Sequence, residues 1–191
     1  LSAILDIKGA PSRTAVTILT DKEEIGSEGC TGLQSSYLKY FIEDLAETFG
    51  TNGRTVFSNS KCLSADVNAA FDPTFSEPFE KLNASYAGRG VVLTKYTGSR
   101  GKSGSNDANA EYMARLREIM DSHEVAFQTS ELGKVDQGGG GTIAYILANY
   151  GMNVIDSGVA VLNMHAPWEI ISKADLYEAF KAYRAFLVKA E

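Results

Sequence analysis

Segments with strand periodicity and segments with helix periodicity alternate along most of this chain, and this alternation constrains the fold more than any other feature. Residues 91–96 form an apolar, β-branched run that predicts a buried strand, and residues 108–122 follow with apolar side chains at helical spacing. Strands separated by helices of this length are typical of an α/β domain. We therefore predict three layers, α/β/α, around a mixed, largely parallel sheet.

The same patterns predict the remaining elements. Strands are expected over residues 11–19, 61–66, 125–129 and 152–162, and helices over residues 1–7, 35–48, 142–150 and 173–189. Gly50 and Gly151 would end two of these helices. Residues 71–90 contain two prolines and two glycines, which predicts a long surface connection, and residues 97–107 read as a polar, glycine-rich loop.

Composition restricts the function more than it reveals it. The chain has 191 residues, enough for one domain with a sizeable core, of which 44% are apolar and 22% charged. Its net charge of −6 argues against a sequence-independent nucleic-acid partner, because no basic stripe is present to neutralise phosphates. No apolar stretch is long enough to cross a bilayer, so we expect no membrane partner.

Two cysteines, Cys30 and Cys62, bear on the cellular compartment. They do not form a CxxC motif, and we expect them to be reduced core thiols in a cytoplasmic protein. A single disulfide between them is the alternative.

The chain opens on Leu1 rather than methionine. Residues 1–7 resemble the interior of an amphipathic helix, with no capping residue ahead of it. We therefore expect the sequence to begin partway through a longer protein.

An acidic pair, Glu23-Glu24, directly follows the apolar run at residues 16–19. Two adjacent carboxylates at the end of a buried strand are costly to desolvate. A fold keeps such a pair when a cation or proton chemistry compensates the cost, as when one carboxylate binds a metal and the other moves protons. The alternative is an ordinary solvated turn.

Three predicted strands end in groups that can bind a metal. The groups are Glu23-Glu24, Asp66 and His165. In open α/β sheets such strand ends converge on one ligand site, and carboxylates with imidazole suit zinc, manganese or cobalt. Separately, Asp66 could cap a helix over residues 67–70, and His165 could be a hydrogen-bonded core histidine.

A run of four glycines, residues 138–141, precedes the predicted helix at residues 142–150. Main-chain N–H groups at a helix start can bind an anion such as a carboxylate, whereas a flexible hinge is the alternative. No lysine follows the glycines as a phosphate-binding P-loop requires, and no G-x-S-x-G motif is present. His123 is expected at the end of a helix, on the surface.

Four motifs resemble, in order, those of the aspartyl aminopeptidase and vacuolar aminopeptidase I family of di-zinc exopeptidases, in its bacterial form. They are Asp21-Lys22-Glu23-Glu24-Ile25-Gly26-Ser27, Ser64-Ala65-Asp66, the glycine run continued to Thr142-Ile143, and Leu162-Asn163-Met164-His165-Ala166. Their spacing is also similar, since Asp66 lies 42 positions after Glu24 and His165 lies 99 positions after Asp66. The resemblance covers essentially the whole chain and implies a zinc-exopeptidase-like fold.

The resemblance implies a role for each site residue. Glu23 matches the general acid/base, which takes a proton from a water activated by two metals and passes it to the leaving amine. Glu24 and His165 match ligands of one zinc, and Asp66 matches a ligand of the other.

The resemblance also implies how a peptide substrate is bound. Lys95 matches a lysine that contacts an acidic side chain at the substrate's N-terminus. Gly139 and Gly140 are also expected to bind the substrate, because their main-chain N–H groups can bind an anion. Residues 99–102 depart from the family's usual pattern, so a neutral or basic preference stays open.

Part of the family's site has no counterpart in this sequence. The family also uses an His-x-Asp histidine and an aspartate that bridges both zincs, both upstream of the acidic pair. We therefore expect residues 1–191 to be the C-terminal part of the catalytic domain, without the oligomerisation domain, from a protein that forms homo-oligomers. The alternatives are a non-catalytic assembly or anion-binding domain of the same fold, and a related di-metal aminopeptidase of glutamyl or broad specificity.

Overall fold

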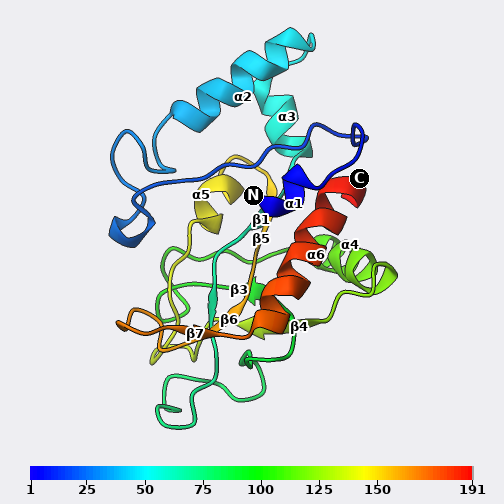
Figure 1. Ribbon diagram of the computed structural model, residues 1–191. Helices are drawn as coiled ribbons and strands as arrows, with labels where there is room; N and C mark the ends of the chain where they lie inside the picture. The colour runs from blue at the N-terminus through cyan, green and yellow to red at the C-terminus, as the bar shows by residue number, and fades with distance from the viewer. Residues whose placement is uncertain (191) are drawn as a thin grey trace.

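A mixed four-stranded sheet forms the centre of the molecule in the computed structural model, which describes residues 1–190 (Figure 1). The strand order is β1-β5-β3-β4, with bounds Lys61–Ser64, Asn153–Gly158, Val91–Tyr96 and Phe127–Glu131. β1 pairs with β5 in parallel, as β3 does with β4, whereas β3 and β5 are antiparallel. The predicted mixed, largely parallel sheet is therefore confirmed.

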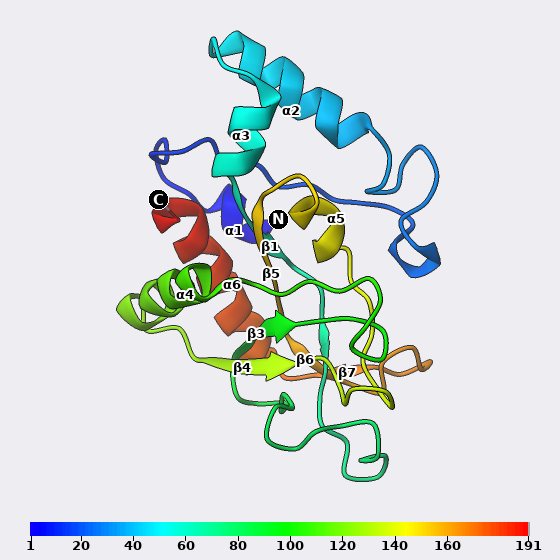
Figure 2. The same ribbon diagram turned by 180° about the vertical axis from the view of Figure 1, so that it is seen from behind.

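Helices cover both faces of this sheet, which confirms the predicted three layers. α4 and α6 lie side by side along one face in both views (Figures 1 and 2), and α5 packs on the other. The helices are α1 (Ser2–Leu5), α2 (Tyr37–Thr48), α3 (Gly53–Asn59), α4 (Ala110–Ser122), α5 (Ala144–Ala148) and α6 (Lys173–Lys189).

Successive side chains along a strand point to opposite faces of the sheet, and both faces of this sheet are buried. Leu93 and Ile155 pack with Leu116 of α4 and Phe186 of α6. Val154, one residue earlier in β5, packs on the other face with the residues of α5. A strand that is buried on both faces has a continuous apolar run in its sequence. This pattern is why the first and last residues of β3 agree with the prediction.

A second, smaller sheet continues from the first and carries part of the site. Its order is β2-β6-β7, with bounds Asn68–Ala69, Ala160–Leu162 and Ile170–Ile171. β5 passes directly into β6, and the chain there runs close to the segment after β1. A Cβ at Gly158 would lie 1.8 Å from the carbonyl oxygen of Asp66, so only glycine permits this approach.

Capping side chains fix the starts of the two long helices. The Asn109 side chain accepts a hydrogen bond from the amide of Tyr112, so α4 begins at Ala110 rather than at residue 108. The Ser172 hydroxyl accepts one from Asp175, and α6 has the predicted bounds. Gly50 and Gly151 both follow helix ends with positive φ, as predicted.

The prediction of a strand over residues 11–19 is wrong. Among residues 1–190, no main-chain group of residues 9–19 bonds to another main-chain group, and a strand requires a paired neighbour. The apolar side chains of this segment are consequently exposed, Leu19 by 77%. They line an apolar groove of about 540 Å³ together with β1, the edge strand of the sheet.

The expectation for the two cysteines is confirmed in part. Cys30 and Cys62 are both free thiols, but Cys30 is exposed and is therefore not a core residue. Within residues 1–190, no helix is both long and apolar enough to cross a membrane.

The core predicts a large difference between two leucine substitutions. Leu116 is 0% exposed between α4 and the sheet, whereas Leu82 is 92% exposed. We expect Leu116→Ala to lower the free energy of unfolding by about 2–5 kcal/mol, because it leaves a cavity. Leu82→Ala should change it by less than about 0.5 kcal/mol. Urea unfolding of both variants measures this, and equal losses would contradict the packing described here.

Candidate metal and catalytic site

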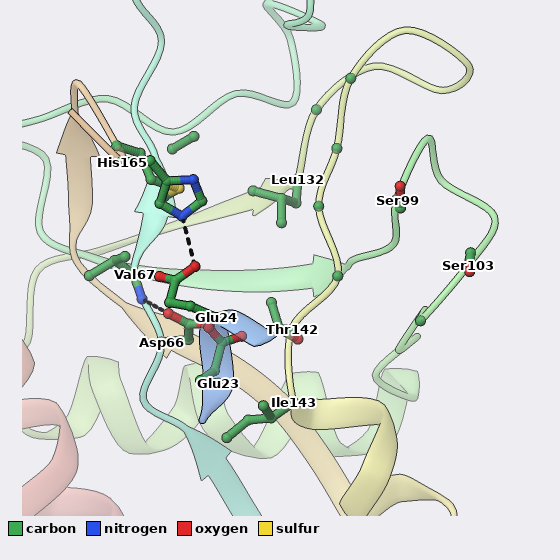
Figure 3. A pocket seen from close by; sticks show the side chains of 18 of the residues that line it. Glu23, Glu24, Asp66, Val67, Ser99, Ser103, Leu132, Thr142, Ile143 and His165 are labelled. Carbon is green, nitrogen blue, oxygen red and sulfur yellow. Dashed lines mark hydrogen bonds and ion pairs between the residues drawn. The ribbon is translucent and has the colours of Figure 1, made fainter. Parts of the chain in front are cut away.

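A cavity of about 860 Å³ opens where β1 and β6 end, and most of the predicted site residues line it (Figure 3). Those that do are Glu23, Glu24, Asp66, Gly139, Gly140 and His165. They come from four separate stretches of the chain, so the folded sheet brings them together. Lys95 is the one predicted site residue that does not line the cavity.

The acidic pair lies on a single turn of 3₁₀ helix, Glu23–Ile25, and not at the end of a strand as predicted. Lys22 and Gly26 flank this turn with left-handed φ values of 65° and 83°. The amide of Ser27 donates to the carbonyl oxygen of Lys22 over 2.8 Å and closes the turn. Both glutamate side chains consequently reach the same cavity (Figure 3).

Asp66 lies in the short connection between β1 and β2. Its Oδ1 accepts a hydrogen bond of 2.8 Å from the amide of Val67, the next residue. Residues 67–70 are not helical, so the alternative role of Asp66 as a helix cap is wrong. The side chain is half-buried at the cavity surface.

His165 lies in the turn between β6 and β7, with a positive φ of 64°. Its main-chain amide donates to Oε1 of Glu169 over 2.7 Å, which holds the turn in place. Its side chain is 67% exposed, so the alternative of a buried core histidine is wrong. The ring atom Nε2 lies 3.3 Å from Oε2 of Glu24 (Figure 3).

The carboxylates of this cavity raise one another's affinity for protons. Burial raises the pKa of Glu23, and the negative charges of Asp66 and Glu24 raise it further. Burial also raises the pKa of Asp66; the Val67 hydrogen bond opposes this rise, and the Glu24 charge adds to it. The site therefore concentrates negative charge that a cation would neutralise.

The donor set fits part of a zinc site. Carboxylate and imidazole are both zinc ligands, and adjacent ligands at tetrahedral zinc lie about 3.3 Å apart when each bond is about 2.0–2.1 Å. The distance of 3.3 Å between His165 Nε2 and Glu24 Oε2 equals this distance between two zinc ligands. Among the described residues 1–190, however, no three His, Cys, Asp or Glu side chains are gathered closely enough to hold a metal. The donors gathered here are thus fewer than a complete zinc site needs.

Residues 138–141, which we call the glycine wall, form the opposite side of the cavity. A Cβ at Gly139 would lie 2.5 Å from the carbonyl oxygen of Gly98, and its φ is 87°, so the position requires glycine. The Gly98 amide donates to the carbonyl oxygen of Gly140 over 2.9 Å. The helix that follows, α5, begins at Ala144 and has only five residues.

Lys95 extends from β3 and forms an ion pair with Asp107, in the loop that follows. Because this lysine is absent from the cavity lining, the structure does not bring it together with the acidic pair.

Sequence reasoning missed an aromatic part of the cavity wall. Phe75 and Phe79 line the cavity, although residues 71–90 were expected to be only a surface connection. That segment does lack helices and strands. The spacing of four between Phe71, Phe75 and Phe79 is the signal for this wall in the sequence.

Asp156, in the middle of β5, is a second residue that the sequence analysis missed. It is 3% exposed, and its Oδ2 accepts a hydrogen bond of 2.9 Å from the hydroxyl of Thr142. Burial raises its pKa to about 7; the nearby hydroxyls of Ser64 and Thr142 oppose this rise, and the charges of Asp66 and Glu23 add to it. A lone carboxylate within an apolar strand was the signal in the sequence.

Fold and site together define an α/β protein whose mixed sheet directs carboxylate and imidazole groups into one cavity. The chain matches the aminopeptidase I zinc metalloprotease family (M18) over residues 1–187, and it belongs to this family.

Relatives of known sequence and structure agree with this assignment. A probable M18 family aminopeptidase 1 of Clostridium acetobutylicum is 58% identical over 189 residues, covering 97% of this chain and 40% of the relative. The crystal structure of aminopeptidase I from the same organism has a TM-score of 0.88 at 57% identity, with 97% and 40% of the two chains covered.

A more distant structure shares the fold alone. It is the mApe1 dodecamer of S. cerevisiae, with a TM-score of 0.68 at 24% identity, and 87% of this chain and 36% of that chain are covered. The present chain spans about 40% of the length of the Clostridium acetobutylicum relative, both in sequence and in the crystal structure.

The buried Asp156 predicts that stability falls as the pH rises. In the unfolded chain this carboxyl loses its proton near its ordinary pKa of 3.8, whereas in the folded chain it does so at about 7. Between about pH 4 and 7 the folded state therefore binds more protons than the unfolded state, and the free energy of unfolding decreases with pH.

Asp156→Asn should remove the part of this decrease that belongs to Asp156. Glu23 and Asp66, whose pKa values are also raised, are present in both proteins, so a pH dependence of stability should remain in the variant. Urea unfolding of the metal-free proteins between pH 4.5 and 7.5 measures the difference. Parallel curves for wild type and variant would show that Asp156 does not titrate in this range.

Proposed function

We propose that this chain is part of the catalytic domain of a zinc-dependent aminopeptidase, which hydrolyses N-terminal residues from peptides. The observation that supports this most directly is the facing pair of Glu24 Oε2 and His165 Nε2, 3.3 Å apart in the cavity that also holds Glu23 and Asp66. Membership of a zinc metalloprotease family is the second support.

Each metal-binding side chain has a separate place in the proposal. Glu24 and His165 would hold one zinc, and Asp66 would hold a second. Manganese and cobalt accept the same donors and are alternatives to zinc. A bound pair of such ions would lower the pKa of water and polarise the scissile carbonyl.

Glu23 is the general acid/base in this proposal. Its neighbour Glu24 faces His165, whereas Glu23 forms no ion pair among the described residues. Burial and the nearby carboxylates raise its pKa, which favours a group that accepts a proton from water and later releases it to the leaving amine.

The active site would be completed by polypeptide other than these 191 residues. The chain spans about 40% of the relatives' length, and residues 1–190 contain no gathered set of three metal ligands. The exposed apolar segment 16–19 and the edge strand β1 share a groove that additional strands could fill. Strands placed there would end beside Glu23 and Asp66 if they ran parallel to β1.

The preference for substrates with an acidic N-terminal residue is a further part of the proposal. Lys95 would contact that acidic side chain, which requires it to leave its ion pair with Asp107. Gly139 and Gly140 would receive the substrate's main chain at the cavity wall. A glutamyl or broad specificity is the alternative, and hydrolysis rates on Asp, Glu, Leu and Lys reporters distinguish them.

We also infer that the whole protein forms homo-oligomers and acts in the cytoplasm. The oligomer is supported by the solved dodecamer that shares this fold. The compartment is supported by the two free cysteines.

A non-catalytic assembly or anion-binding domain is the second candidate function. It is favoured by one observation: among residues 1–190, no three His, Cys, Asp or Glu side chains are gathered closely enough to hold a metal. In that case Glu23 would have no chemical role.

Glu23→Gln distinguishes these candidates in the natural polypeptide that contains this chain. We expect the variant to keep its zinc content and to lose aminopeptidase activity by a factor of about 10² or more, because the amide cannot accept the proton. Release of an aminoacyl reporter and metal analysis measure the two effects. Glu28→Gln is a matched control, since Glu28 lies on the next turn, outside the cavity lining. Unchanged activity and metal content in Glu23→Gln would favour the non-catalytic domain.

A further inference from the structure

The glycine wall has few attachments to the rest of the molecule. Within residues 1–190, its main chain is held by the hydrogen bond from Gly98 to Gly140 and by the bond from Gly138 to the carbonyl oxygen of Lys134, of 2.7 Å. Four successive glycines provide no side chain to pack. Thr142, the next residue, is the first that can attach the wall through a side chain.

Thr142 attaches to the centre of the sheet. Its hydroxyl is buried and donates to Oδ2 of Asp156 over 2.9 Å, and its Oγ1 lies 3.4 Å from the amide nitrogen of Ala144, the first residue of α5. One hydroxyl thus connects the end of the glycine wall, the start of α5 and the middle of β5.

The pleat of β5 places Asp156 for this contact. Val154 faces α5, and Asp156, two residues later, points to the same face. Asp156 is aligned with Ser64 of β1, two residues before Asp66. The acceptor of the Thr142 hydroxyl therefore belongs to the same pair of strands that positions a predicted metal ligand.

The cost of burying Asp156 indicates that the contact has a use. Its Oδ1 makes no hydrogen bond of good geometry within residues 1–190, although the Ser64 hydroxyl lies near the carboxyl, and the side chain is 3% exposed. A buried carboxyl with an unsatisfied oxygen is unfavourable compared with an apolar residue such as those before it in β5. Packing alone would favour a valine or isoleucine there.

We propose that Asp156 is a positioning residue, which fixes the glycine wall against the metal-binding side of the cavity through the hydroxyl of Thr142. The consequence for substrate rests on the proposed function: the wall receives the peptide, and Asp156 sets its distance from Asp66 and the acidic pair. The attachment itself does not depend on any activity.

Hydrogen exchange in the natural polypeptide that contains this chain tests the attachment directly. The amides of Gly98 and Gly138 are the reporters. The Gly98 amide donates to Gly140 in the wall, and the Gly138 amide, which belongs to the wall, donates to Lys134. We expect Thr142→Val and Asp156→Ala to raise their exchange rates about tenfold or more, since each removes a buried hydrogen bond. Thr142→Ser and Asp156→Asn, which keep a donor and an acceptor, should stay within about threefold of wild type.

Tyr112→Phe is the matched control. It also removes one buried hydroxyl hydrogen bond, from Tyr112 to the carbonyl oxygen of Cys62, but on the side of the sheet that faces α4. It should leave the two reporter amides unchanged. Unchanged exchange in both Thr142→Val and Asp156→Ala would overturn the proposal. An equal rise in Tyr112→Phe would also overturn it.

Kinetics of the natural polypeptide test the consequence separately. Thr142→Val should raise KM about tenfold and change kcat by less than about threefold, because the wall acts in binding, and Thr142→Ser should restore KM. Faster exchange with an unchanged KM would overturn the role in substrate binding. If the wild-type polypeptide proves inactive, the proposed function fails, while the exchange rates still decide whether Asp156 holds the wall.

Discussion

The parallel pairing of β1 with β5 is the constraint on which the site depends. Asp66 follows β1 by two residues, and β5 leads through Gly158 and β6 to the turn that carries His165. Gly158 lets the end of β5 approach the segment after β1, because any side chain there would collide with the carbonyl oxygen of Asp66. Asp156, in the same strand pair, accepts the hydroxyl that follows the glycine wall. Two adjacent strands therefore set the distance between both sides of the cavity.

The charges of the cavity explain why such an arrangement needs a cation. Three carboxylates, from Glu23, Glu24 and Asp66, share one space, and the pKa values of Glu23 and Asp66 are raised by burial and by their neighbours. His165 contacts only one of them, Glu24. A divalent cation would lower the energy of all three carboxylates at once, whereas protonation would neutralise them individually.

Local sequence patterns predicted the elements that local forces determine. β3 and α6 have the predicted bounds because their apolar periodicity and caps lie within the segments themselves. Residues 11–19 have an equally good strand pattern, yet a strand also needs a neighbour, which the pattern cannot show. Six of the seven predicted site residues line the cavity, but the sequence analysis missed Asp156, whose contact with Thr142, 14 positions away, no local pattern shows. The ion pair of Lys95 with Asp107 likewise arises only from the folded loop.

Zinc affinity of the natural polypeptide tests the central claim most directly. The chain offers a matched pair of substitutions, because its two histidines lie in different surroundings: His165 in the cavity and His123 at the end of α4. Titration of the metal-free protein should show that His165→Ala weakens zinc binding about 10-fold or more, while His123→Ala leaves it unchanged. Wild-type zinc affinity in His165→Ala would contradict the assignment of this cavity as the metal site.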